Sequence, residues 1–442
     1  MELTSYGAAG VVTGSKHLLT SKGLNFLVDS GLFQGEGVEK KNEDVLPFKA
    51  HEIKAIFLTH AHLDHCGYLP VLVKSGFHGK IYCTKATRSL AEIILLDSAK
   101  IQEYEAKESQ TKKHLLYEEE DVLRTLDFFD TCDFDKTYHC EHLTFSFHTA
   151  GHVLGAAFLR VELEGKSLTF SGDIGQPYDM LMPSPAPLIQ TDYLVLESTY
   201  GDRIHSKENT INHIASELKE VIANGGTLLV PVFALARLQL FLAYLHEVFT
   251  IYPELKIAAF VDSPMGSAMT KVYKDFHYLL RPTEKEFLTY LESAKILEFS
   301  KETEKMHKMT GPKIIIASSG MISGGRIMNH VERLGKYEST TILLTGYQGK
   351  GTIGRELLEG AREIRINGHR QKIRAKVSML ESLSAHADKE QLLDWVQTAS
   401  KNPHKIFLVH GEPESLGPFK EFLSSNLESI VEINAEGKSQ SL

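Results

Sequence analysis

The chain has 442 residues, of which 42% are hydrophobic and 24% charged, a composition that indicates a globular protein of two or three domains. No apolar run is long enough to span a bilayer, and MELTSYGAAGVV lacks the basic start of a secretory signal, so we expect no membrane partner and a cytoplasmic location. Four cysteines without CxxC spacing argue against a disulfide framework or a thiolate zinc site. A net charge of −9 is unusual for a nucleic-acid binder but leaves room for a local basic patch.

The first half of the chain predicts short strands separated by glycine turns. The apolar runs are NFLVDSG, HEIKAIFLTH, HLTFSFHTAGH, AAFLRVEL, KSLTFSGD and TDYLVLEST. Between them, residues 85–107 carry apolar side chains at helical spacing, which predicts an amphipathic helix. Polar residues stand where the predicted strands end, at Asp29, His60, His152, Asp173 and Glu197.

From about residue 205 the pattern changes to helices that alternate with buried strands. Helices are predicted over 209–223 and 235–249, and a charged helix over 284–308. Pro264 is expected to open another helix at its first position, with Ser263 as the cap. The strands between them are TLLVPVFA, KIAAFVD, KIIIASSG and TILLTG. This alternation predicts a mostly parallel sheet covered on both faces.

The tail repeats the pattern of the first half, because KVSMLESLSAH and KIFLVHG predict strands that end in His386 and His410. The simplest organisation is one domain, made of residues 1–203 and 376–442, that is interrupted by an inserted domain over residues 204–375.

The segment THAHLDHCG, residues 59–67, is the strongest signal for chemistry. His60 and His62 are two residues apart and therefore need a loop rather than a helix to face one ion. Such a loop at a strand end can aim His60 and His62 at one cation, and Asp64 and His65 at a second. Imidazole and carboxylate without thiolate suit Zn²⁺, with Mn²⁺ or Fe²⁺ as alternatives. A polar turn with incidental histidines would not concentrate four ligands in this way.

The other candidate ligands are weak signals when each is taken alone. His152 follows a glycine, His410 precedes one, and Asp29 and Asp173 are typical of turns. All four lie at predicted strand ends, where the edge of a sheet brings together residues that are distant in the sequence. This common position favours a shared site.

The runs HAHLDHCG, TAGHVLGA and SGDIG resemble the metallo-β-lactamase superfamily. ESTYG at 197–201, SAHAD at 384–388 and VHGE at 409–412 resemble three further motifs of its β-CASP branch, whose members process RNA and DNA. GAAGVVTGSKHLL, PVFALAR, ASSGMISGGR and TGYQ extend the resemblance over nearly the whole chain. The glutamate at 197 and SAHAD are most similar to the subgroup of the mRNA 3′-end cleavage endonuclease and its prokaryotic relatives. The resemblance implies an α/β fold, an αββα sandwich with an inserted β-CASP domain.

The resemblance also implies a zinc-dependent ribonuclease with two ions per chain. One ion would be held by His60, His62 and His152, the second by Asp64, His65 and His410. Asp173 would bridge the two, and Asp29 would orient a ligand or a metal-bound water. A hydroxide held between the ions would hydrolyse RNA and leave 5′-phosphate and 3′-OH ends. His386 would donate a proton to the leaving oxygen, and Glu197 would fix its tautomer.

The inserted domain is expected to form the second wall of a cleft that holds RNA phosphates. Ser319, Gly320 and Arg326 offer a hydroxyl, a free amide and a guanidinium, and Tyr347 and Gln348 end the next strand. Residues 362–376 gather six basic side chains against one acid. A solvated hairpin is the alternative interpretation of this segment, and RNA tracking is the functional one.

Two other functions remain open from the sequence. One is a small-molecule hydrolase of thioesterase or lactonase type on the same fold, and the other is a non-catalytic RNA-binding scaffold. The long insertion and the pair His386 and Glu197 disfavour the first, and the complete ligand set disfavours the second. The sequence does not decide between endonuclease and 5′→3′ exonuclease action, between single-stranded RNA and DNA, or between a monomer and a homo-oligomer.

Overall fold

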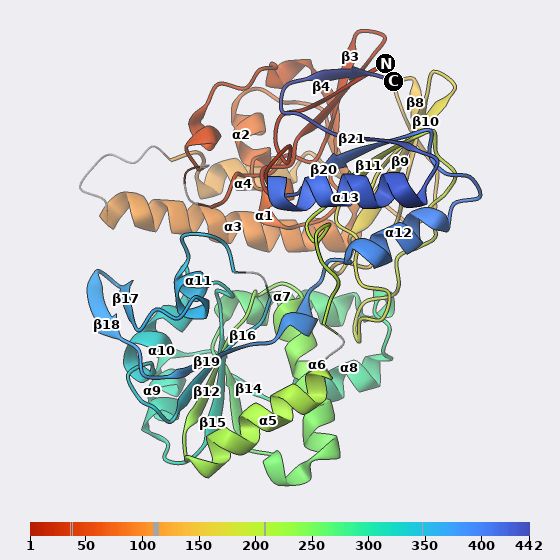
Figure 1. Cartoon of the computed structure of the whole chain (residues 1–442). Coiled ribbons are helices and arrows are strands. Elements are labelled where there is room, and N and C mark those ends of the chain that lie inside the picture. The colour runs from red at the N-terminus through yellow and green to blue at the C-terminus, as the bar shows by residue number, and fades with distance from the viewer. Residues whose placement is uncertain (36, 38, 109–114, 207–208, 347) are drawn as a thin grey trace. The chain divides into compact units, whose positions relative to one another are not determined.

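The computed structural model describes residues 1–442 apart from 36, 38, 109–114, 207–208 and 347. The chain folds into two compact units, Met1–Ile204 with His386–Leu442, and His205–Ala385 (Figure 1). Among the described residues, no helix has the length and apolar character needed to cross a membrane.

The first unit contains two sheets, each of seven strands within the described residues. In spatial order, the first sheet comprises β22 (Ser439–Ser441), β1 (Glu2–Ser5), β2 (His17–Ser21), β3 (Leu24–Val28), β4 (Ile53–Phe57), β5 (Lys80–Thr84) and β6 (Phe129–Cys132). The second comprises β21 (Ile430–Ile433), β20 (Lys405–Val409), β11 (Tyr193–Glu197), β10 (Lys166–Phe170), β9 (Ala157–Leu163), β8 (Leu143–Thr149) and β7 (Tyr138–Cys140).

The two sheets share one apolar core. Phe26 and Phe57 of the first sheet belong to the same buried cluster as Phe145, Leu159 and Phe170 of the second. Outside the first sheet lie helices α1 (Leu63–Cys66), α2 (Leu69–Lys74), α3 (Lys85–Glu108) and α4 (Glu119–Leu126). Helices α12 (Lys389–Gln397) and α13 (Pro413–Asn426) pack on the second sheet, where Trp395 lies edge-on to Phe158. This is the expected αββα sandwich (Figure 1).

The strand directions bring the expected ligands to one edge of the sandwich. β3 runs parallel to β4, β10 and β11 are parallel, and β11 is parallel to β20. β8 runs antiparallel to β9, and β9 antiparallel to β10, so β8 has the same direction as β10. The carboxyl ends of these strands therefore meet at the same edge, as they do at ligand sites of open α/β sheets.

The second unit is built on a six-stranded sheet over its described residues, and every strand pair in it is parallel. In spatial order the strands are β14 (Lys295–Ile296), β13 (Ala258–Val261), β15 (Lys313–Ala317), β12 (Thr227–Pro231), β16 (Thr340–Leu344) and β19 (Lys376–Met379). A separate hairpin joins β17 (Glu363–Ile366) and β18 (His369–Lys372).

Helices cover both faces of this parallel sheet. Leu229 and Ile315 face a core shared with Ile327 and Val331, whereas the neighbouring strand residues are buried on the opposite face, against α5. The helices are α5 (Thr210–Ala223), α6 (Arg237–Ile251), α7 (Pro264–Asp275), α8 (Glu284–Leu291), α9 (Ser300–Lys308), α10 (Arg326–Leu334) and α11 (Ile353–Leu358). Pro264 opens α7 as expected, and the Ser263 hydroxyl accepts the Gly266 N–H at 3.0 Å.

Three expectations need correction. The predicted helix over 284–308 is two helices, because β14 lies between them and pairs with β13. The predicted strand ending in His386 stops at Met379, and a 3₁₀ turn over Glu381–Leu383 follows. The inserted unit extends to Ala385 rather than residue 375, because β19 pairs with β16 inside its sheet.

Candidate metal centre

The predicted ligands lie after strands of the first unit, either in loops or in the short helix α1. His60 and His62 follow β4, and Asp64 and His65 lie in the short helix α1. His152 follows β8, Asp173 follows β10, and His410 is the residue after β20. The structure brings all seven of these side chains together in two adjoining groups.

The first group combines His60, His62 and His152. The Nδ1 atom of His62 lies 3.1 Å from Nε2 of both His60 and His152. Three ring nitrogens that converge in this way match the separation of about 3.3 Å expected between ligands of one tetrahedral ion with metal–nitrogen bonds near 2.0–2.1 Å. Burial and the neighbouring imidazoles hold the pKa of His60 well below its usual value, so its ring is neutral and free to coordinate.

The second group combines Asp64, His65 and His410. His410 Nε2 lies 3.1 Å from His65 Nε2 and 3.3 Å from Asp64 Oδ2. Burial opposes ionisation of Asp64, but the hydrogen bond with His410 and the nearby imidazoles lower its pKa below the usual value. The group therefore presents two imidazoles and one carboxylate toward a common point.

Asp173 lies between the two groups, with one carboxylate oxygen toward each. Its Oδ2 lies 3.3 Å from His60 Nε2 and 3.5 Å from His152 Nε2. Its Oδ1 lies 3.5 Å from His65 Nε2 and 3.8 Å from His410 Nε2. The side chain is only 2% exposed, yet Oδ1 has no hydrogen-bond donor among the described residues. A buried carboxylate oxygen without a donor is costly, and a bound cation would compensate its charge, so the residues fit a metal centre.

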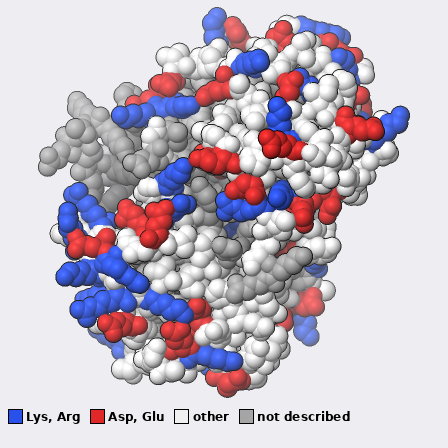
Figure 2. Space-filling view, viewed as in Figure 1, with Lys and Arg blue, Asp and Glu red and all other residues white. Residues whose placement is uncertain are grey.

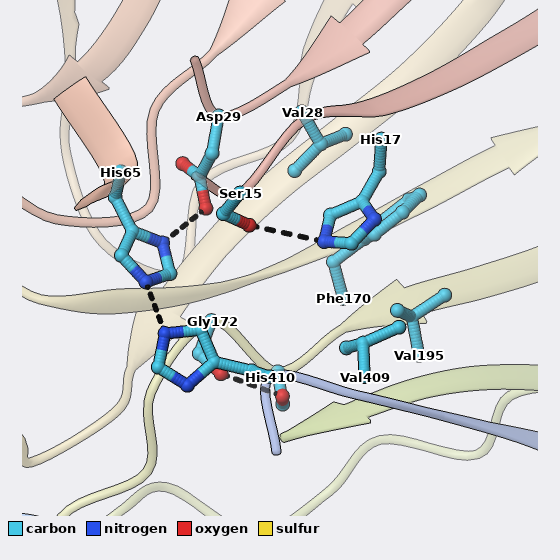
Figure 3. Close-up of a pocket in the computed structure, with 11 residues that line it drawn as sticks. Ser15, His17, Val28, Asp29, His65, Phe170, Gly172, Val195, Val409 and His410 are labelled. Atoms are coloured by element: carbon cyan, nitrogen blue, oxygen red, sulfur yellow. Dashed lines mark hydrogen bonds and ion pairs between the residues drawn. The ribbon is translucent and has the colours of Figure 1, made fainter. Parts of the chain in front are cut away.

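Asp29 contacts the second group through His65 and fixes the orientation of that ring. Its Oδ2 accepts the His65 Nδ1–H at 2.7 Å, which directs Nε2 toward His410 (Figure 3). The same Nε2 lies 3.5 Å from Asp173 Oδ1. The backbone N–H and hydroxyl of Thr59 also donate to Asp29, each at 2.8 Å. On His410, the Thr199 hydroxyl is bonded to Nδ1 at 3.0 Å and leaves Nε2 facing the group. Carboxylate or hydroxyl partners of this kind set the tautomer of a metal-binding histidine.

The buried residues Ser15, Lys16 and His17, at the start of β2, form contacts around the second group. The Ser15 N–H donates to the Asp64 carbonyl at 2.8 Å, and the Ser15 hydroxyl bonds His17 at 3.0 Å across a small pocket (Figure 3). Lys16 is 2% exposed, donates to the Gly31 carbonyl, and lies 4.6 Å from the ring centres of both Phe33 and Tyr68. Burial lowers the pKa of Lys16 to about 7.

His386 and Glu197 form a pair beside Asp173. His386 Nδ1 lies 3.2 Å from both Glu197 oxygens and 3.9 Å from Asp173 Oδ2. Glu197 is fully buried and also accepts the Ile174 N–H at 2.7 Å. Burial opposes ionisation of Glu197, but the charge and hydrogen bond of His386 lower its pKa below the usual value. His386 reaches this place because its segment pairs with Gly175, not through a strand.

Exposure shows from which side the site is reached. Asp64 and His386 each keep 17% of the side chain exposed, and His62 is also partly exposed. The remaining ligands are buried. The site is therefore open to solvent at Asp64, His62 and His386.

The predicted substrate-binding residues of the inserted unit have partners within that unit. Arg326 forms an ion pair with the fully buried Asp262, which also bonds His330 at 2.9 Å. Gln348 is 2% exposed, and its amide donates to the carbonyls of Gly320 and Gly346. The Ser319 hydroxyl accepts the N–H of Ser323 at 3.0 Å. Gln348 thus holds the loop, whereas Arg326 stays partly exposed. Tyr347 lies outside the described residues.

The basic segment 362–376 is only partly free for RNA. Lys376 is bonded to Glu217 at 2.9 Å and Glu220 at 2.6 Å, and Arg370 lies 3.1 Å from Glu363. Lys372 and Arg374 are exposed. Figure 2 shows Lys and Arg side chains gathered over the β17–β18 hairpin, with carboxylates among them.

Thr59, Thr199 and the segment from Ser15 to His17 were not predicted from the sequence as parts of the site. Thr59 directly precedes His60, and Thr199 lies in the ESTYG motif, so their positions were available as signals. Nothing in the sequence pairs Ser15 with Asp64, because that contact depends on the fold.

Three family models match the chain. Residues 9–212 match the metallo-beta-lactamase superfamily, and residues 238–357 match the Beta-Casp domain. Residues 370–434 match the Zn-dependent metallo-hydrolase RNA specificity domain.

Relatives match over nearly the full chain. Ribonuclease TTHA0252 of Thermus thermophilus is 33% identical, over 94% of each chain. The RNase J-like protein of Methanocaldococcus jannaschii is 32% identical, over 89% of this chain and 88% of its own. Cleavage and polyadenylation specificity factor 73 of Drosophila melanogaster is 29% identical over 97% of this chain, which spans 62% of that protein. A crystal structure of a protein of unknown function from Enterococcus faecalis shares the fold, with a TM-score of 0.58 at 11% identity, covering 100% of this chain and 99% of that one.

Proposed function

The chain belongs to the β-CASP branch of the metallo-β-lactamase superfamily, and from this premise we propose that it is a two-metal ribonuclease that hydrolyses RNA with water as the nucleophile. The observation that carries the proposal is Asp173. Its two oxygens face two separate groups of three ligands, and one of these oxygens is buried without a donor among the described residues.

The donor set favours two Zn²⁺ ions, with Mn²⁺ as the alternative. His60, His62 and His152 would hold one ion, and Asp64, His65 and His410 the other, with Asp173 shared. Imidazole and carboxylate ligands without thiolate suit these metals. When bound, such ions lower the pKa of water and neutralise charge on a phosphate.

Asp29 and Thr199 orient ligands in this scheme. The carboxylate of Asp29 accepts a hydrogen bond from the His65 Nδ1–H, and the Thr199 hydroxyl is bonded to the Nδ1 of His410, so both rings offer Nε2 to the site. The hydrogen bonds from Thr59 keep Asp29 in place. Loss of such partners typically lowers metal affinity or activity 10–100-fold.

His386 is proposed as the proton donor to the leaving ribose oxygen. Glu197 binds Nδ1, so the Nε2 edge of the ring is the one that can give a proton. The second Glu197 oxygen also lies 3.2 Å from Nδ1, so the carboxylate holds that edge of the ring. Its partial exposure, 17%, lets a substrate oxygen reach the ring.

In the inserted domain, Ser319, Gly320, Arg326 and Lys372 are proposed to hold phosphates of single-stranded RNA. Arg326 is the best placed of these, because Asp262 binds one side of its guanidinium and the side chain remains 31% exposed. RNA rather than DNA is proposed as the substrate because relatives of this chain bear ribonuclease names.

The test is digestion of 5′-labelled and internally labelled single-stranded RNA, with matched DNA and a thioester as competing substrates. We expect RNA products with 5′-phosphate and 3′-OH ends, and loss of cleavage after chelation. A 2′,3′-cyclic phosphate would contradict attack by water. Turnover of the thioester without RNA cleavage would favour the small-molecule hydrolase, and RNA binding without turnover would favour the scaffold.

A further inference from the structure

We propose that Tyr178 is a stacking platform for a base of the RNA beside the bond that is cleaved, an inference that rests on the proposed ribonuclease function. Tyr178 follows Asp173 by five residues, in the loop that leaves the metal centre. Its side chain is 83% exposed, more than any other tyrosine among the described exposed residues.

The ring is exposed on a loop that is internally fixed. Asp179 Oδ1 accepts the N–H groups of Leu181 and Met182, both at 2.7 Å, and the Ser184 hydroxyl donates to the Pro177 carbonyl at 2.7 Å. Leu181 and Met182 are buried at 1% and 5% exposure. The loop thus buries the apolar side chains that follow Tyr178 and presents the tyrosine ring to solvent.

Both ends of this loop are bonded to the segments that carry site histidines. At the first end, Gly175 pairs with His386 and donates to the Ala150 carbonyl at 2.8 Å. At the other end, the Ala186 N–H donates to the Thr149 carbonyl at 2.8 Å, two residues before the Gly151–His152 turn. Three residues of chain span at most about 11 Å, so Tyr178 lies no farther than this from Gly175, the residue that pairs with His386.

The chemistry of the ring supplies a contact that the metal centre lacks. The grouped ligands of the centre are imidazoles and carboxylates, which are suited to the phosphate and the leaving oxygen. The Tyr200 ring lies 5.9 Å from that of His386 but is only 7% exposed, so it does not offer an open face to a base. An exposed aromatic ring stacks on any base, which suits a nuclease without strict sequence preference. A protein partner would need a contiguous apolar patch, whereas the loop residues beside Tyr178 are Pro177 and Asp179.

The experiment compares Tyr178→Ala, Tyr178→Phe and the unaltered metal-loaded enzyme on one single-stranded RNA and on versions with a single abasic nucleotide at each position around the cut. Stacking of one base is worth about a 5- to 150-fold change in binding. We expect Tyr178→Ala to raise KM by a factor in this range with little change in kcat, and Tyr178→Phe to behave like the unaltered enzyme. Tyr278→Ala, which removes another exposed tyrosine, serves as the matched control.

The series of abasic RNAs shows whether the Tyr178 ring stacks on a base. At the stacking position, the abasic RNA should raise the KM of the unaltered enzyme to that of Tyr178→Ala, and the variant should show no further rise. Equal KM values for Tyr178→Ala and the unaltered enzyme on intact RNA would overturn the proposal, as would the same rise on every abasic RNA. Quenching of 2-aminopurine at that position reports stacking without cleavage, so a failure of the ribonuclease function is distinguished from a failure at Tyr178.

Discussion

Asp29 and His410 hold backbone conformations that residues other than glycine rarely adopt, with φ of 59° and 53°. Each directly follows a strand, β3 or β20, and each has its side chain bound to a neighbour in the site. Such conformations cost on the order of 1–3 kcal/mol and persist where the surroundings fix them, often at functional sites. Here the turned backbone directs the side chain into the centre instead of along the strand.

The first prediction concerns metal content. Six ligands around a shared Asp173 should bind two zinc equivalents per chain, and Asp173→Ala should lower occupancy at both positions because each group loses one oxygen. Elemental analysis after gel filtration measures this. Asp192→Ala, a surface carboxylate bonded to Ser167, is the control and should keep both equivalents. One equivalent or none in the unaltered protein would refute the dinuclear site.

The second prediction concerns His386. His386→Ala should keep both metals and the fold but lose about 10²–10⁴-fold in kcat, the range typical of a positioned general acid. Glu197→Gln should lose less, because Glu197 only orients His386. Single-turnover cleavage and metal analysis are measured on the same preparations. If His386→Ala loses metal instead, then His386 is a ligand, as its distance of 3.9 Å from Asp173 also permits.

At the scale of elements, the strands that precede the site residues, such as β4, β8, β10, β11 and β20, could be predicted, whereas β2 and β5 inside the first sheet and several edge strands could not. The sequences of buried parallel strands are continuous apolar runs, and the polar residue after each run marks the carboxyl end of the strand. The short antiparallel strands β1, β7 and β22 carry little apolar pattern, and none of them was predicted from the sequence.

The two local errors also have physical causes. Leu380 and Leu383 are both fully buried and three residues apart, which is the repeat of a 3₁₀ turn rather than of a strand. The break in the predicted helix over 284–308 was signalled by Glu302, which accepts the N–H groups of Glu298 and Phe299 at a second helix start. A shared site was expected from the places of the ligands at strand ends, and their division into two groups from the family resemblance. The supporting contact of Ser15 with Asp64 could come only from the structure.

The third prediction belongs to the β17–β18 hairpin. Removing the charges of Arg370, Lys372 and Arg374 together should raise KM for RNA and flatten its salt dependence, by about 0.7 in the log–log slope for each phosphate that is no longer neutralised. kcat should change little, because these residues would bind ground and transition states alike. Lys376→Gln is the matched control, since Glu217 and Glu220 already neutralise Lys376. An unchanged slope in the triple variant would identify the hairpin as a solvated surface.

At the scale of the whole molecule, the site belongs to a domain that the chain leaves and re-enters. Residues up to Ile204 supply most ligands, while His386 and His410 come from the segment after the insertion. The metal centre therefore forms only when both segments are folded together. The inserted unit is continuous in sequence, with its own parallel sheet and core. Metal binding should thus raise the free energy of unfolding of the first unit and leave that of the inserted unit unchanged.

Calorimetry with and without a chelator tests this last prediction. A ligand that binds only the folded state at 1,000 times its dissociation constant adds about 4 kcal/mol, which for a domain of this size shifts Tm by on the order of 10 °C. We expect two unfolding transitions, and removal of metal should lower the Tm of only one of them. Residues 205–385 expressed alone should unfold at the Tm of the transition that does not change. His152→Ala in metal-replete buffer should lower the same transition, because it removes a ligand of the first group. A single transition that moves down as a whole would show instead that the two units unfold as one cooperative body, and that the metal centre stabilises the entire chain.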